Sequence, residues 1–343
     1  ATSIGKSGGL GTAKQSKVPV VTDYLFGIQR DIRRGFVLTA QYVGNTQRYV
    51  LENYDYNLIP FGARFMPQNA DPTSTSGAPL PNAFLGPLTQ GYTNMLVSHP
   101  AARTRYDSLQ TSIRRRFASG LELDGNFTWA KGFGYNTWSQ VLPVKDFWGL
   151  VATDQTFVAN ITYVYDLPKF SKWVPGSASK WFLDNWQISG ITTFGSGFPM
   201  NISLNTTDSF DFTGGGDVTA QAALTCNPEK SFGSRTFAQF FNTNCVARPA
   251  GRGSLGSILN NAPIRGPGFN NWDSSLFKNF PIRESKIIQF RWEVYNVLNH
   301  AEASGLNLTA RFNPAGQQTN GAFGQVTSTL PERRMQFSFR FNF

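Results

Sequence analysis

Apolar and polar residues alternate without a break over the last eleven residues of the chain, RRMQFSFRFNF (333–343). In an extended strand, successive side chains point to opposite faces. The pattern therefore predicts a strand that ends on an aromatic residue and has one strongly apolar face. In a soluble sandwich this face would lie in the core, whereas in a membrane barrel it would contact lipid. The apolar face consists of Met335, Phe337, Phe339, Phe341 and Phe343, and the polar face consists of Arg334, Gln336, Ser338, Arg340 and Asn342.

The same alternation occurs in KIIQFRWEVYNVL (286–298), YDSLQTSIRRRF (106–117) and LELDGNFTWAK (121–131). Helical periodicity is not sustained in any part of the sequence. With five weaker segments included, the sequence predicts nine strands of about ten residues, the length that a tilted strand needs to cross a bilayer. The weaker segments are 22–33, 36–47, 153–166, 184–196 and 271–282.

Short and long connections alternate between the predicted strands. Tight turns are expected at 33–35, 118–120 and 283–285, and a longer proline-containing link is expected between 166 and 184. Outer-membrane barrels have short periplasmic turns and long extracellular loops, while a soluble sandwich has no reason for this arrangement. We therefore predict an all-β fold, an antiparallel transmembrane β-barrel in residues 22–343, preceded by a loop or an incomplete strand in residues 1–21. The long outer loops are expected at about 48–105, 132–152, 197–270 and 300–333.

The polar faces of the predicted strands carry charged residues at mid-strand. A dry sandwich core could not bury such residues unpaired, so a sandwich would turn them to water. In a barrel they face the wet lumen, where they could pair with one another, contact a plug or line a permeation path. Trp129, Trp186 and Trp272 lie near predicted strand ends, as in an interfacial aromatic girdle, although each could also pack in a sandwich core. The predicted lumen-facing residues are Arg114, Arg116, Asp124, Gln289, Arg291, Glu293, Arg334, Gln336 and Arg340.

The composition narrows the class of protein further. Of the 343 residues, 15% are charged and 14% aromatic, with 33 glycines and 30 phenylalanines. A chain of this composition has too many aromatic residues and glycines for a helical enzyme, and too many apolar residues for a disordered protein. A mean hydropathy of -0.27 is compatible with a barrel, because only every second residue contacts lipid. The net charge of +10 does not indicate nucleic-acid binding, because the basic residues are scattered and no zinc-binding spacing or RNP-like motif is present.

The two cysteines, Cys226 and Cys245, both lie in the predicted loop 197–270. An even pair in an exported protein favours a disulfide, and two free thiols are the alternative. A disulfide here would stabilise the loop by about 3 kcal/mol on the chain-entropy model.

The segment DSFDFTGGGD (208–217) places Asp208, Asp211 and Asp217 around three glycines. Calcium binds flexible clusters of carboxylates, although this spacing matches no EF-hand. The segment is therefore either a solvated loop or a weak calcium site that would order the loop.

Catalytic chemistry has little support in the sequence. The only histidines, His99 and His300, fall in predicted loops or at a strand end. The segment GSGFP (195–199) lacks the Gly-x-Ser-x-Gly frame of a nucleophile elbow. We expect no enzymatic activity and no cofactor, with an embedded outer-membrane hydrolase as the enzymatic alternative.

A set of six segments, in this order along the chain, resembles the C-terminal barrel region of TonB-dependent outer-membrane receptors. The most similar group is the Oar-like one, whose members carry a carboxypeptidase-regulatory-like domain at the N-terminus. The resemblance covers most of residues 20–343 and depends on the ordered set rather than on any one motif. The segments are YDSLQTSIRRRFASGLELDGNFTWAK (106–131), WQISGITTFGSGFPMNI (186–202), RTFAQFFNTNCVARPA (235–250), RGPGFNNWDSSLFKNFPI (265–282), RWEVYNVLNH (291–300) and FGQVTSTLPERRMQFSFRFNF (323–343).

The resemblance implies a barrel of about 22 strands filled by a plug, of which this chain would supply roughly the last nine. It implies the outer membrane of a Gram-negative bacterium, with lipid and lipopolysaccharide around the barrel. The expected partners are an extracellular nutrient bound by the loops, the TonB complex acting through an N-terminal part not recognised here, and the barrel assembly machinery. That machinery would read Phe339, Phe341 and Phe343 as a C-terminal signal, whereas an edge strand of a soluble sheet is the other explanation of these residues.

Two further functions share every strand feature. One is a surface barrel whose loops bind cells, matrix or proteins without transport, and the other is a passive porin-like channel. A plug and a TonB box upstream would favour transport over both.

Overall fold

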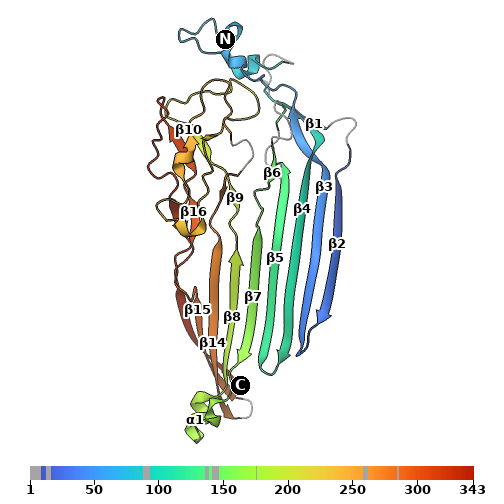
Figure 1. Cartoon of the computed structure of the whole chain (residues 1–343), viewed down its shortest axis with the longest axis vertical. Helices are drawn as coiled ribbons and strands as arrows, with labels where there is room; N and C mark the ends of the chain where they lie inside the picture. Colours follow the sequence, from blue (N-terminus) through green and yellow to red (C-terminus); the bar gives the residue numbers. More distant parts are fainter. Residues whose placement is uncertain are drawn as a thin grey trace.

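Nine long strands of the computed structural model form one antiparallel sheet in which each strand pairs with its neighbours in sequence (Figure 1). All nine strands predicted from the alternation are confirmed. They are β2 (Val20–Asp31), β3 (Phe36–Asp55), β4 (Met95–Ala118), β5 (Leu121–Tyr135), β7 (Phe157–Asp166), β8 (Trp186–Gly195), β14 (Phe269–Arg283), β15 (Lys286–Tyr295) and β19 (Arg334–Asn342). The structure describes residues 9–12, 17–87, 93–135, 139–140, 147–174, 176–257, 262–283 and 286–343.

Strands β3 and β4 are longer than the alternation predicts. Their ladder continues to Asp55 and back to Met95, with a register shift at Arg48 and Val50. The predicted loop 48–105 is therefore partly strand, because backbone pairing continues beyond the alternating part of both strands. Two short strands extend the same sheet, β1 (Gly9–Thr12) parallel to β4 and β6 (Trp148–Leu150) antiparallel to β5.

Short connections lie at one end of the sheet and long ones at the other (Figure 1). The β2–β3 turn has positive φ angles at Arg33, Arg34 and Gly35, and the β4–β5 turn has them at Ser119 and Gly120. The left-handed conformation closes both hairpins within a few residues. The predicted turn at 283–285 includes residues 284 and 285, which lie outside the described residues.

The link between β7 and β8 is longer and projects from the short-turn end of the sheet, the end at which the C-terminus also lies (Figure 1). It contains the 3₁₀ helix η5 (Phe170–Lys172) and the helix α1 (Ser177–Leu183). The sequence predicts the length of this link but not its helix, since seven residues are too few to establish a helical period. Among the described residues, no helix has the length and apolar character needed to cross a membrane.

The two faces of the sheet differ in polarity, as the alternation predicts. The register of β15 and β19 places Phe339 opposite Phe290 and Phe337 opposite Trp292 on one face. Phe337 is 62% exposed and Phe339 is 73% exposed, so this apolar face is uncovered. It continues around the sheet through Phe26, Ile28, Leu38, Leu109, Phe127, Trp129, Phe157, Ile161 and Tyr165, all more than a third exposed.

The opposite face is polar and curves around a hollow of about 510 Å³. The hollow is lined from β5, β7, β8, β14 and β15, and Asp124, Arg291 and Glu293 contribute to it. Arg291 pairs with Glu293 at 3.1 Å, and Arg114 lies 3.8 Å from Asp124 on the same face. The register also places Gln289, Arg334, Gln336 and Arg340 on this face, and Arg116 lines a second hollow there with Arg114.

The sheet has two free edges among the described residues, because β2 and β19 each pair with only one long strand. Smaller elements occupy the long connections. They are η1 (Ala63–Phe65), η2 (Pro67–Asn69), η3 (Asn82–Phe84), η6 (Phe232–Ser234), η7 (Thr243–Cys245), β9 (Pro199–Met200), β10 (Ser203–Thr206), β11 (Ala223–Leu224), β12 (Val246–Ala247), β13 (Ile264–Arg265), β16 (Ala303–Leu306), β17 (Thr309–Phe312) and β18 (Val326–Thr329).

Candidate functional site

The described residues of the long connections 196–268 and 296–333 fold together into one unit, the outer loop module, at the end of the sheet opposite the short turns (Figure 1). β10 from the first connection pairs in parallel with β17 from the second. β9 pairs with β13 and β11 with β12 inside the first connection, and β16 pairs with β18 inside the second. Each of these strands has only two to four residues, so the ladders alone could not stabilise the module.

A small hydrophobic core stabilises the outer loop module. Phe241 is fully buried and packs edge to face against Phe323, with ring centroids 5.3 Å apart. Each buried side chain of this size contributes about 1.5–3 kcal/mol relative to an exposed one. The two connections therefore behave as a folded domain rather than as loose loops. The buried residues are Ile202, Ala222, Phe240, Phe241, Val246, Ile264, Ala310, Phe312 and Phe323.

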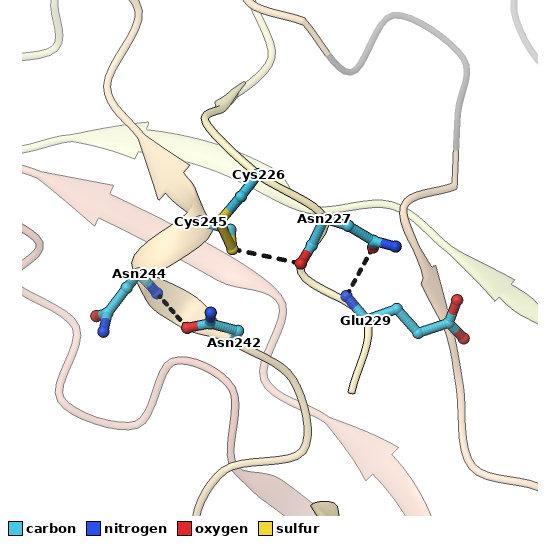
Figure 2. Close-up of a disulfide and its surroundings, with 6 residues drawn as sticks. All are labelled: Cys226, Asn227, Glu229, Asn242, Asn244 and Cys245. Atoms are coloured by element: carbon cyan, nitrogen blue, oxygen red, sulfur yellow. Dashed lines mark hydrogen bonds between the residues drawn. A yellow bond between two sulfur atoms is a disulfide. The ribbon is translucent and has the colours of Figure 1, made fainter. Parts of the chain in front are cut away.

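A disulfide joins Cys226 and Cys245 next to this core, which is the pairing expected from the sequence (Figure 2). The two Cα atoms are 4.8 Å apart and Cys245 is fully buried. The bridge lies beside the β11–β12 pair and closes the segment between these strands. Asn242 caps η7 by accepting a hydrogen bond from the backbone N–H of Asn244, so the turn that presents Cys245 is itself fixed.

A run of three glycines in the first connection contacts the β3–β4 connection and holds it against the module. The three are Gly214, Gly215 and Gly216. The backbone N–H of Gly62 donates to the carbonyl of Thr213, and that of Gly216 donates to the carbonyl of Ile59. Gly215 has φ +142°, and a Cβ atom there would lie 2.3 Å from the carbonyl oxygen of Pro60. Only glycine allows both this conformation and this approach. The run of glycines is thus a docking surface for another loop.

The three aspartates of the same segment do not form a calcium site. In the described part of the chain no three acidic, histidine or cysteine side chains are grouped to hold a metal. Asp208 pairs with Arg248 at 3.0 Å, and Asp211 pairs with Arg64 of the β3–β4 connection at 3.0 Å. Asp217 accepts hydrogen bonds from Ser139 Oγ and from the backbone N–H of Gln140, in the β5–β7 connection. The weak calcium prediction was wrong, because each carboxylate contacts a different segment.

The charges in this segment shift the pKa values of two of its carboxyl groups. The hydrogen bond from Arg248 holds the pKa of Asp208 below its usual value. Burial acts to raise the pKa of Asp211, but the N–H of Gly214, the guanidinium of Arg64 and the N–H of Thr213 outweigh it and lower the pKa. Both carboxylates are therefore ionised wherever the loops are docked near neutral pH.

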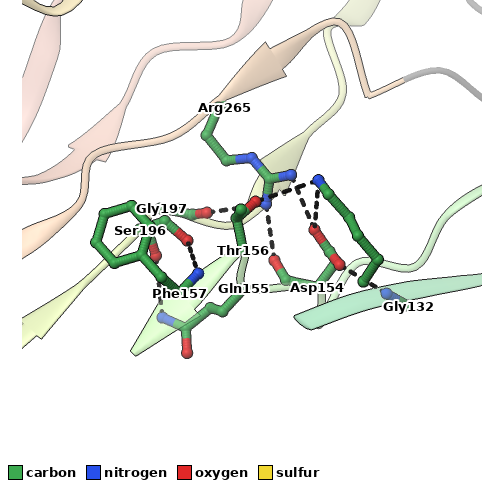
Figure 3. Close-up of polar contacts among 9 residues, drawn as sticks. Gly132, Asp154, Gln155, Thr156, Phe157, Ser196, Gly197 and Arg265 are labelled. Atoms are coloured by element: carbon green, nitrogen blue, oxygen red, sulfur yellow. Dashed lines mark hydrogen bonds and ion pairs between the residues drawn. The ribbon is translucent and has the colours of Figure 1, made fainter. Parts of the chain in front are cut away.

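A cluster of ion pairs and hydrogen bonds around Asp154 joins the module to the sheet (Figure 3). Asp154 is a buried residue between β6 and β7. Its carboxylate accepts from Arg265 at 2.8 Å and from the backbone N–H of Gly132 at 2.7 Å, with Lys131 3.9 Å away. Arg265 also donates to the carbonyls of Asp154 and Gly197. Removing one partner of such a buried pair leaves an uncompensated charge. This cluster was not predicted, because Asp154 lies inside the strand expected over 153–166.

The exposed surface of the module has two polar hollows that share Asn205 and Thr206. One, of about 470 Å³, also takes in Thr309, Arg311 and Asn320. The other, of about 400 Å³, reaches Phe210 and Asp211. Amide, hydroxyl and guanidinium groups dominate both hollows, so they suit a ligand rich in hydrogen-bonding groups.

Both histidines take part in structural contacts. His99 packs against the rings of Tyr54 and Tyr56. His300 lies 2.8 Å from Glu302, whose carboxylate also accepts from the backbone N–H of Asn270. These contacts join strand ends to loops.

Solved structures with a similar arrangement include the following three. The ferric-catecholate import receptor Fiu from Escherichia coli K12 is 10% identical, with a TM-score of 0.44 over 95% of this chain and 28% of that one. The outer membrane transporter YddB from Escherichia coli is 10% identical, with a TM-score of 0.44 over 100% and 34%. The FrpB iron transporter from Neisseria meningitidis is 11% identical, with a TM-score of 0.44 over 99% and 34%. The chain thus spans about a third of the length of these proteins.

No curated protein sequence matches the chain. A family model, that of the outer membrane beta barrel domain, matches residues 1–336. The match indicates a location in the outer membrane of a Gram-negative bacterium. The polarity of the sheet faces and the alternation of short and long connections agree with it. The chain belongs to the outer membrane beta barrel domain family.

Proposed function

We propose that residues 22–343 are the C-terminal part of the barrel of a TonB-dependent receptor of the Oar-like group. The complete protein would bind an extracellular nutrient with its outer loops and import it with energy relayed by TonB. The ordered segments between residues 106 and 343 that resemble this group support the assignment.

The observation that carries the proposal is the pair of free edges on a sheet whose outer face is apolar. β2 and β19 each present a row of backbone donors and acceptors without a long neighbouring strand among the described residues. Unpaired backbone groups cannot remain in hydrocarbon, so further strands must close the sheet. A barrel of about 22 strands would do so and would leave room for a plug.

The polar face would line the lumen of this barrel. Arg114, Asp124, Arg291 and Glu293 form ion pairs along it, around the hollow of about 510 Å³. In a water-filled or plugged lumen such partly exposed pairs cost little desolvation energy. The set predicted from the sequence would contact a plug or line the path of the nutrient.

The outer loop module would supply part of the nutrient site. Its core and disulfide hold the two polar hollows in a fixed shape before any ligand arrives. A preformed site of this kind favours binding, because less conformational entropy is lost when the ligand docks.

The last strand would guide assembly of the barrel. Phe339, Phe341 and Phe343 lie exposed on the lipid-facing side of the final strand, where the assembly machinery would reach them. Their exposure is consistent with a signal that is read before the barrel closes.

The rigid outer loop module also favours a second candidate, a surface barrel that binds other cells or matrix without transport. To separate the two, the complete gene product is purified from outer membranes and titrated with the purified periplasmic domain of TonB from the same organism. Saturable binding supports the receptor.

A lack of binding would contradict the receptor. Steady conductance in planar bilayers would then identify a passive channel, and neither binding nor conductance would leave the adhesive barrel.

A further inference from the structure

Three arginines gather on the lipid-facing side of β3 and β4, towards the loop end of the sheet. Arg48 lies directly opposite Arg103, and Arg105 lies two residues from Arg103 on the same face. All three are exposed. The strands alternate regularly here, so these arginines share the face of Leu109 rather than the polar face. We call Arg48, Arg103 and Arg105 the arginine patch.

The arginine patch carries more positive charge than its neighbours balance. The nearby carboxylate of Asp107 already forms an ion pair with Arg105, with the Nε atom of Arg105 2.6 Å from the carboxylate oxygen. The hydroxyl of Tyr24 donates to the same carboxylate at 2.9 Å, and that of Tyr42 donates to it as well.

Neither Arg48 nor Arg103 forms an ion pair with a carboxylate within the described residues. Two like charges placed directly opposite in a sheet destabilise it unless an anion lies between them. The pair is thus suited to receive one.

An aromatic ring stacks on one guanidinium of the patch, and a neighbouring lysine lies over another ring. The guanidinium of Arg103 lies 4.8 Å from the ring centroid of Trp148, and Lys17 Nζ lies 4.7 Å from that of Tyr49. A guanidinium stacked on a ring keeps its planar edge of N–H donors free. The geometry therefore leaves the donors of Arg103 available to a second partner.

The height of the patch places it at the membrane surface. Tyr42, Leu109 and Trp129 form one row across β3, β4 and β5, as the register shows, and this row ends the apolar part of the face. Tyr and Trp typically occupy the interface between hydrocarbon and headgroups. Arg105 lies four residues beyond Leu109, which is about 13 Å along the strand and about 10 Å along the membrane normal for a tilt of about 40°. That is the level of the lipid headgroups in the outer leaflet.

We propose that the arginine patch binds the phosphate groups of a phosphorylated glycolipid, lipid A, in the outer leaflet. Arginine binds phosphate through two parallel hydrogen bonds, and Arg48 and Arg103 together could hold one phosphate between two strands. The site rests on the outer-membrane location of the family and not on the transport function.

The test measures binding of lipid A to the complete gene product, folded in detergent, by native mass spectrometry. Bisphosphorylated lipid A, dephosphorylated lipid A and inorganic phosphate are the three probes. The variant R48Q/R103Q removes the unpaired charges, and R30Q removes an exposed arginine from the same face at the short-turn end as a matched control. Heat-modified mobility on gels verifies that each variant is folded.

We expect bisphosphorylated lipid A to bind the parent protein and R30Q with equal affinity, and to bind R48Q/R103Q at least about tenfold more weakly, given the strength of hydrogen bonds to charged groups. Equal binding of the dephosphorylated lipid would overturn the proposal, as would unchanged affinity in folded R48Q/R103Q. Inorganic phosphate that binds as tightly as lipid A would show a site for free anions and contradict the assignment to lipid.

Discussion

The membrane sheet and the outer loop module are built by opposite principles. In the sheet every long strand pairs with its neighbours in sequence, and the large side chains of the apolar face remain exposed for lipid. In the module the residues that pack together come from segments far apart, as Phe241 and Phe323 do, and the core is buried by protein alone.

This difference separates local from non-local information. The order of a strand meander follows from short-range alternation, because the bilayer acts as the apolar solvent for one face. The module depends on contacts of long sequence separation, whose loop-closure entropy must be overcome before they become favourable. We therefore expect the effect of a substitution in the sheet to depend on the face that it occupies. The effect of a substitution in the module should depend on the contacts that it breaks.

The largest expected effect comes from a charge on the lipid-facing side of the sheet. Phe337→Arg should destabilise the membrane-inserted barrel by about 2–4 kcal/mol, because the guanidinium would lie in hydrocarbon. Gln336→Arg is the matched control, since its side chain lies on the polar face opposite Glu293. Urea titration of the complete protein in lipid vesicles measures both. Equal losses for the two variants would contradict the assignment of the faces.

Loss of the disulfide should act on the outer loop module and leave the sheet intact. Cys226→Ser together with Cys245→Ser should destabilise the module by about 3 kcal/mol, the entropy that the bridge removes from the unfolded loop. Limited proteolysis in outer-membrane vesicles should then cut within 226–245 while the heat-modified mobility of the barrel is unchanged. A module as resistant as the parent, or a barrel that fails to fold, would show that the two regions are not separable in this way.

Docking of the β3–β4 connection should depend on Gly215. Gly215→Ala forces a Cβ atom against the carbonyl of Pro60, which should cost about 1–3 kcal/mol of docking energy. Gly251→Ala is the control, because a Cβ atom there would meet nothing within 4 Å. Hydrogen exchange of residues 59–65 should rise in the first variant only. Equal protection in both variants would mean that the glycine run is not the docking surface.

The smallest effect is a dependence of the same docking on pH. The folded-state pKa of Asp211 is lowered, so its contribution is fully present above the unfolded pKa of about 3.9 and is lost as the pH falls through the folded value. The pair with Arg64 is partly exposed and should contribute about 1 kcal/mol or less. The protection factors of residues 59–65, which correct the exchange rates for their intrinsic dependence on pH, should be lower at about pH 3 than at pH 6, and Asp211→Asn should remove the difference. A pH dependence that persists in this variant would assign it to another group.

The sequence predicted the sheet well because alternation is a local property. All nine strands and the alternation of connection lengths are confirmed. The outer halves of β3 and β4 were not predicted. Pro100 and the mixed residues around it break the alternation there, although the backbone pairing of the two strands continues. The helix α1 was not predicted because it has only seven residues.

The outer loop module was not predicted, although a signal was present. Segments assigned to loops carry the aromatic run FAQFF (237–241) and the isolated residues Ile202, Ile264 and Phe312, more apolar surface than solvated loops need. No local rule states which of these residues meet. The spacing of Asp208, Asp211 and Asp217 likewise could not indicate that each carboxylate contacts a different segment.

The most direct test of the account is the accessibility of single cysteines along β19. Gln336, Ser338, Phe337 and Phe339 are replaced one at a time by cysteine in the complete protein, where Cys226 and Cys245 are occupied by their disulfide. A water-soluble maleimide is then applied to outer-membrane vesicles opened to both sides. We predict labelling at 336 and 338 and protection at 337 and 339, because the former face an aqueous lumen and the latter face lipid. Uniform labelling, or the opposite alternation, would contradict a barrel whose polar face is its interior.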